Sequence, residues 1–419
     1  MFTSTKRWSL PAHPHRKAGV RPLLVLAIGA LLAGSALAQP ALSLTTDEGP
    51  VGRYRPQHTD AEREKIRKNL VNGVTIPYWT QPITSPINGV TYPMTMVGSS
   101  SPFDEKPKNS PIQYQLIALK IKVKTDAGIV VQNPMTPPCG EKVPAIDLMM
   151  QSPLFKEVPF KVNGVDVTKS IGGAAQFSSI FQRANFWGQL TKTDPQGNHW
   201  QVHLKSSVKK PIFEEIELDG TSREYTCVGG KGTSARVKMA EFEPKVWEIV
   251  KKHAAPNQII FIMPYNVVML SKNERFIVYG WHDAIPIGND VQTFAVSSYF
   301  DTVSYTANFH LNDIDSMVHE YVELLNDPFA EGTEKPFPSM NEVPKWRTPS
   351  GSCQRNLEPG DAISWYNATP YEITGANGYR YHFRDSAFYQ WFSRLPTTAA
   401  GGKYSMMGTL TNYQENICQ

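Results

Sequence analysis

The stretch that decides the fold of the second half of this chain is Asp313–Pro328, DIDSMVHEYVELLNDP. Its apolar residues recur at positions i, i+4 and i+7, which is the spacing of one helix face: Val318, Val322 and Leu325. Asp313 or Asp315 is expected to cap the amino end of the helix, and Pro328 is expected to end it. The pattern therefore predicts one amphipathic helix.

On such a helix His319 and Glu323 lie four residues apart and project from one face, with Glu320 beside them. This arrangement resembles the His-Glu-x-x-His helix of zinc peptidases, with Glu323 in place of the second histidine. In that chemistry the two outer residues hold the metal, and the inner glutamate accepts a proton from the metal-bound water. We therefore expect His319 and Glu323 to bind Zn²⁺ and Glu320 to be the general base. A carboxylate ligand also makes Mn²⁺ or Ca²⁺ possible. The competing interpretation is a solvated helix face with a simple His319–Glu323 pair.

A third metal ligand has to come from outside this pair. Glu358 is the first candidate, because it follows Glu323 by 35 positions in the sequence Leu-Glu-Pro-Gly-Asp. Asp361, in the same sequence, is the second candidate, and Asp327 on the helix itself is the third. The same composition is equally typical of an ordinary acidic turn.

Two other histidines are relevant to the site. His282, in Gly-Trp-His-Asp at 280–283, is expected at a strand end before the helix, where it could line the cleft and steady a substrate oxyanion. The alternative is a partly exposed histidine paired with Asp283. His310 is a fallback metal ligand.

The surroundings of the helix are similar to a pattern in exported bacterial proteins of uncharacterised function. Those proteins read roughly as Ser-His-Glu-x-x-Glu, then Asp-Pro, a Trp, and Glu-Ile-Gly-Asp. Here Val318 replaces the serine and Pro359 the isoleucine, and Trp346 is the tryptophan. Further similar segments are SPLF at 152–155, QRANFW at 182–187 and YGWH at 279–282. The resemblance covers about residues 110–395 and implies an exported protein with a zincin-like helix.

The amino-terminal residues have the pattern of a secretory signal. Residues 1–38 contain five basic residues and no acidic one, and an apolar run, Pro22–Ala33, precedes Ala36 and Ala38 at the −3 and −1 positions of a cleavage site. An uncleaved anchor is the alternative. Without this leader the formal charge changes from +4 to −1, because 37 bases remain against 38 acids. We therefore expect a secreted or periplasmic protein without a nucleic-acid partner or a later membrane span.

Four cysteines lie after the leader, and none forms a Cys-x-x-Cys pair. An even number in an exported chain favours two disulfides, for which three pairings exist. Proximity in the sequence suggests Cys139–Cys227 and Cys353–Cys418.

Periodicity predicts an α+β fold with a strand-rich domain at 39–235 and a zincin-like α+β domain at 236–419. Besides the central helix, helices are expected at 60–70, 176–190, 240–254 and 385–395. Strands are expected at 113–124, 199–205, 259–262, 276–280 and 293–299, and acidic turns at 211–232.

The functional expectation is an exported zinc-dependent hydrolase, metallopeptidase-like, acting on a peptide or protein substrate. No serine-hydrolase elbow, phosphate-binding loop or dinucleotide fingerprint appears in the sequence. The alternative is a non-catalytic secreted or periplasmic binding protein that keeps a zincin-like fold. An aromatic content of 11% would suit carbohydrate binding, although most aromatic side chains fill cores.

Overall fold

The computed structural model describes residues 58–193, 199–207, 210–227, 230–271, 277–301, 311–329, 341–349, 351–363 and 370–418. All of them belong to one compact unit. Helices and strands both contribute extensively, so the α+β class is confirmed. The predicted leader at 1–38 and His310 lie outside the described residues.

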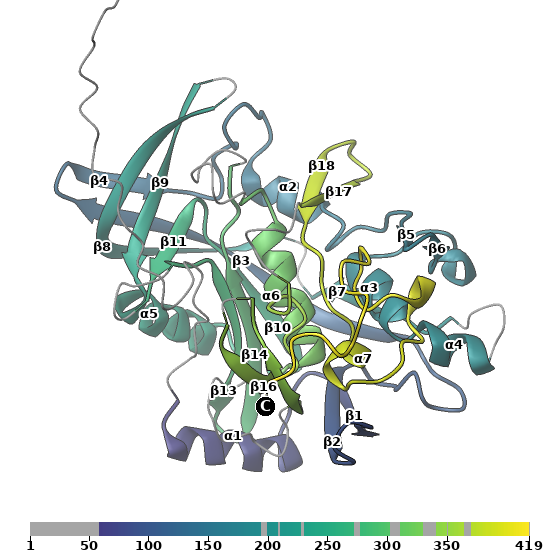
Figure 1. The fold of residues 1–419 in the computed structure, drawn as a ribbon. Coiled ribbons are helices and arrows are strands. Elements are labelled where there is room, and N and C mark those ends of the chain that lie inside the picture. Colours follow the sequence, from purple (N-terminus) through teal and green to yellow (C-terminus); the bar gives the residue numbers. More distant parts are fainter. Residues whose placement is uncertain are drawn as a thin grey trace, which may run out of the picture. The chain divides into compact units, whose positions relative to one another are not determined.

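A ten-stranded mixed sheet is the main element of the fold (Figure 1). Eight strands follow the order β12-β11-β9-β8-β3-β10-β14-β13, and β4 and β7 also pair with β3. Parallel pairs join β3 to β7, β8 and β10, and join β10 to β14. The bounds are β3 Ser110–Thr125, β4 Gly128–Gln132, β7 Val202–Ser206, β8 Ile212–Cys227, β9 Gly230–Lys238, β10 Gln258–Met263, β11 Val267–Leu270, β12 Ile277–Val278, β13 Gly280–Ile287 and β14 Asp290–Ser297.

The helices and smaller hairpins surround this sheet. The helices are α1 Asp60–Asn72, α2 Ala145–Gln151, α3 Phe177–Asn185, α4 Trp187–Thr193, α5 Met239–Lys252, α6 Asp315–Asn326 and α7 Tyr389–Phe392, with short 3-10 turns at Lys169–Ile171 and Ala400–Gly402. Four antiparallel hairpins pair β1 Tyr78–Thr84 with β2 Thr91–Val97, β5 Lys161–Val162 with β6 Val165–Asp166, β15 Glu342–Arg347 with β16 Cys353–Asn356, and β17 Tyr371–Thr374 with β18 Arg380–Phe383. Among the described residues, no helix has the length and apolar character needed to cross a membrane.

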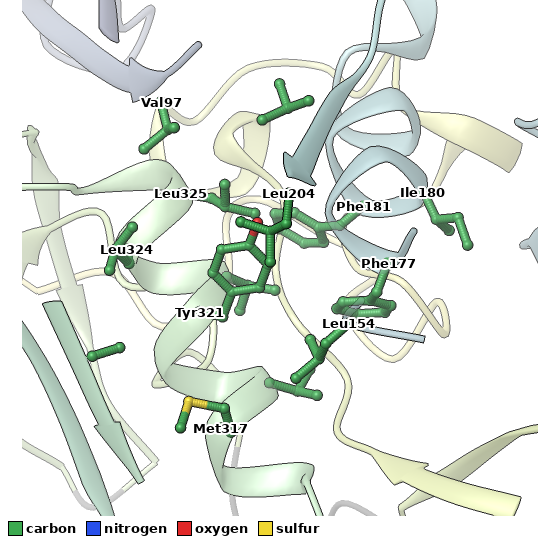
Figure 2. Packing of buried hydrophobic residues seen from close by; sticks show 14 of the residues in the cluster. Val97, Leu154, Phe177, Ile180, Phe181, Leu204, Met317, Tyr321, Leu324 and Leu325 are labelled. Carbon is green, nitrogen blue, oxygen red and sulfur yellow. The ribbon is translucent and has the colours of Figure 1, made fainter. Parts of the chain in front are cut away.

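Side-chain alternation along the central strands builds a core on each face of the sheet. In β10, Phe261 belongs to the core that includes α3 and α6, whereas Ile260 and Ile262 belong to the core that includes α5. Figure 2 shows the first core at close range, with Tyr321 of α6 lying between the helix and α3. The Tyr321 ring also packs edge-on against Phe261, at 5.2 Å between centroids. The helix that carries the predicted site is therefore the centre of a core.

The segment 211–232, for which acidic turns were predicted, is mostly strand: it contains all of β8 and the start of β9, and residues 228–229 between them lie outside the described residues. The acidic residues that suggested turns alternate along β8 and pair with lysines of β3. Lys120 and Lys122 both contact Glu215, and Lys124 contacts Glu217. Opposite charges on neighbouring strands thus stabilise a strand whose own composition disfavours it.

The predicted helix at 385–395 is also wrong in length, because only Tyr389–Phe392 is helical. The side chain of Asp385 accepts hydrogen bonds from the Met407 amide at 2.8 Å and the Ser405 hydroxyl at 2.8 Å. The Asp385 side chain is therefore hydrogen-bonded to a loop near the carboxyl end of the chain, and the residues around Asp385 do not continue the helix.

The sheet takes strands from both sides of the predicted domain boundary at residue 235. β10, which follows that boundary, pairs with β3, which precedes it, over six residues from Gln258 to Met263. β14, at 290–297, pairs in turn with β10. Two disulfides connect the periphery: Cys139 is joined to Cys227, and Cys353 to Cys418. The predicted pairing is therefore confirmed.

Candidate metal centre

The helix α6 carries three of the predicted site residues in a buried position. Its amino end differs from the expectation, because Ile314 occupies the N-cap and neither aspartate caps the helix with its side chain. Asp313 instead binds His382 of β18, at 2.6 Å. His319, Glu320 and Glu323 are only 6%, 7% and 4% exposed. The interpretation of this stretch as a solvated helix face is therefore wrong.

His319, Glu323 and Asp361 form one group of possible metal ligands. His319 Nε2 lies 3.3 Å from Glu323 Oε1 and 3.5 Å from Asp361 Oδ1. The backbone amide of Asp361 donates a hydrogen bond to Glu323 Oε1 at 3.1 Å, which holds the loop after β16 against the helix. The structure thus brings together the two predicted helix ligands and the second of the three candidates for the third ligand.

His282, Glu320 and Glu323 form a second group. His282 Nδ1 lies 3.4 Å from Glu320 Oε2 and 3.8 Å from Glu323 Oε2. His282 reaches α6 because it occupies a position on β13 whose side chain faces that helix. The next residue, Asp283, faces the other side of the sheet, where it pairs with His58 at 3.0 Å. The expected alternative, a partly exposed His282 paired with Asp283, is therefore wrong.

Glu358 and Asp327 are not in either group of possible ligands. Glu358 is 1% exposed and accepts a hydrogen bond from Asn356 Nδ2 at 2.7 Å. Asp327 is fully buried at the end of α6, where its Oδ1 faces the amide of Asn341 at 3.5 Å. Glu358, the first candidate for the third ligand, thus lies near the site with its Oε1 bound to a neighbouring amide group.

The separations in the two groups are longer than the closest histidine–carboxylate contacts elsewhere in the described residues, although His382 Nε2 also lies 3.7 Å from Glu372 Oε1. His58, His253 and His382 approach a carboxylate at 3.0, 2.5 and 2.6 Å, as directly hydrogen-bonded groups do. The four separations around His282 and His319 are 3.3–3.8 Å. Two ligands that each lie about 2.1 Å from a tetrahedral cation are about 3.4 Å apart. The separations in the two groups therefore fit the spacing of ligands around one ion, and the His282–Glu320 separation also fits a long hydrogen bond.

Two glycines allow the backbone to approach these ligands closely. A Cβ on Gly360 would lie 2.3 Å from His319 Nδ1, and a Cβ on Gly280 would lie 2.7 Å from Glu320 Cγ. Any larger residue at either position would displace a site side chain. Sequence reasoning missed both contacts, although Gly280 and Gly360 stand within two residues of predicted site residues.

The electrostatic environment of the site favours positive charge. Burial alone would lower the pKa of His282, but Glu320, Glu358 and Asp327 outweigh it and raise this pKa from 6.5 to about 9. Asp361 is the most accessible of the ligand side chains, at 21% exposed. Buried His, Glu and Asp groups of this composition could hold a divalent cation, and Zn²⁺ and Mn²⁺ both accept mixed nitrogen and oxygen ligands.

Comparison of the chain with protein-family models, with curated proteins and with solved structures finds no match. The geometry of the site therefore carries the functional argument.

Proposed function

We propose that this protein is an exported metal-dependent hydrolase, metallopeptidase-like, which uses the His319–Glu323–Asp361 group to hold its catalytic cation, with Zn²⁺ as the first candidate. The observation that carries the proposal is the convergence of His319, Glu323 and Asp361 into one group, in which the separations of 3.3 and 3.5 Å from His319 Nε2 fit the ligands of one cation. A resident cation would polarise a substrate carbonyl and make a water molecule more acidic.

Glu320 is the proposed general base. It follows the ligand His319 on α6, and its Oε2 lies 3.4 Å from His282 Nδ1. The imidazole of His282 holds the Glu320 carboxylate in position and offers a hydrogen-bond donor to charge that develops on a substrate oxygen. The two disulfides are typical of chains that fold in an oxidising compartment, which supports the exported location.

The test combines metal analysis with hydrolysis of a fluorogenic peptide library. The purified chain should contain one tightly bound cation, which His319→Ala should lose. Glu320→Gln should keep this cation but hydrolyse peptides at least about 100-fold more slowly, because general-base catalysis contributes about that much. Glu342→Gln is the matched control, since this glutamate lies on β15 and pairs with Arg355.

Two results would contradict this proposal. Full hydrolytic activity in Glu320→Gln would remove the base role of this residue. A cation bound through His319 without any hydrolysis by the wild type would instead favour a binding protein in which the ion has a structural role.

A further inference from the structure

The two carboxylate oxygens of Glu323 face different histidines. Oε1 lies 3.3 Å from His319 Nε2, and Oε2 lies 3.8 Å from His282 Nδ1. The same glutamate therefore belongs to both groups of possible ligands. A carboxylate that offers one oxygen to each of two groups has the arrangement of a bridge between two metal ions, which lie about 3.5–4 Å apart in such sites.

The charge of the buried groups also exceeds what one divalent cation balances. Glu320, Glu323 and Asp361 together bring three negative charges when ionised, and Glu320 and Glu323 are at most 7% exposed. Desolvated carboxylates are costly unless opposite charge or hydrogen bonds compensate them. One divalent cation leaves a net charge of −1 on these three carboxylates, which either a protonated His282 or a second cation in its place can balance.

His282 presents its Nδ1 atom to both carboxylates of the second group, at 3.4 Å from Glu320 and 3.8 Å from Glu323. Its side chain is 6% exposed, and its Nε2 has no hydrogen-bond partner among the residues that the structure describes. The close approach of Gly280 to Glu320, where a Cβ would lie 2.7 Å from Cγ, keeps β13 tight against the second group.

We propose that His282, Glu320 and the Oε2 atom of Glu323 form a second divalent-cation site, bridged to the first through Glu323. The proposal rests on the proposed function for the first cation and adds regulation to it. When the second cation is bound, Glu320 is a ligand and no longer accepts a proton, so this cation inhibits hydrolysis. Repulsion between two cations makes the second one to enter bind more weakly, and excess metal therefore acts as the inhibitor.

Metal stoichiometry tests this site without any substrate. The full chain is purified, stripped of metal and titrated with Mn²⁺, while electron paramagnetic resonance counts the free ion and detects magnetic coupling between bound ions. We expect two Mn²⁺ per wild-type chain, with a coupled spectrum once the second site fills. His282→Gln and Glu320→Gln should each bind one uncoupled Mn²⁺. Asp361→Asn should weaken the other site.

The control variant is His253→Gln, which removes a histidine that pairs with Glu214 at 2.5 Å outside both ligand groups, and it should still bind two Mn²⁺. Thermal unfolding of each variant tests whether the fold is kept. Because the second group is tested by two variants, one of them still gives a result if the other does not fold. Wild-type binding of a single Mn²⁺ that His319→Ala abolishes would overturn the second site and leave the proposed function intact. Two ions that survive both His282→Gln and Glu320→Gln would also overturn it. No binding at all would refute both proposals.

Discussion

Replacing Gly360 by alanine places a methyl group against the ring of His319. The new Cβ would lie 2.3 Å from Nδ1, whereas ordinary van der Waals contact begins at 3.4 Å. Either the imidazole moves away by about 1.1 Å, the difference of these two distances, or the loop moves and carries Asp361 with it. Both movements displace a proposed ligand by several times the ~0.2 Å that metal–ligand distances tolerate.

We expect Gly360→Ala to weaken Zn²⁺ binding by at least about 100-fold, or about 2.7 kcal/mol, since even substitutions of groups behind the ligands cost about 10- to 100-fold. Competition with a chromophoric chelator of known affinity measures this loss. The matched control is Gly232→Ala on β9, whose Cβ would lie equally close, at 2.3 Å, to the ring of Tyr225. It should lower the melting temperature and keep the Zn²⁺ affinity. Unchanged Zn²⁺ affinity in a folded Gly360→Ala variant would refute the assignment of His319 and Asp361 as ligands.

Two further predictions concern pH and the cross-links. Burial lowers the pKa of His382, but Asp313 outweighs burial and raises this pKa above 6.5. The histidine therefore contributes its full share to the unfolding free energy below pH 6.5. This contribution is lost as the pH rises through the pKa of the folded state. The melting temperatures of the wild type and His382→Gln should converge as the pH rises above 6.5, and a gap that widens would contradict the assignment. Replacing Cys353 and Cys418 by serine opens a link across 65 residues and should lower the unfolding free energy by about 4 kcal/mol, measured by urea denaturation. Unreduced wild type should have almost no free thiol, and four titratable thiols would refute the pairing.

The sequence by itself determined the elements whose pattern is local. The 3.6-residue spacing of Val318, Val322 and Leu325 predicted α6 to within two residues at its start, and the alternation in QYQLIALKIKVK predicted most of β3. The separation of four residues between His319 and Glu323 similarly placed both side chains on one face of the helix. These features depend only on backbone geometry within one element.

The tertiary structure decided which distant residues meet that face. Asp361 and Glu358 are three residues apart in one loop, and the packing of Gly360 on the His319 ring, together with the hydrogen bond from the Asp361 amide to Glu323, brings Asp361 into the group of ligands. His282 reaches Glu320 because β13 lies beside β14 in the sheet and α6 packs on these strands. β8 likewise lies beside β3, a strand about 90 residues earlier in the chain, whose lysines pair with its glutamates. Each outcome depends on contacts between residues far apart in the chain, for which a single sequence has no periodic signal.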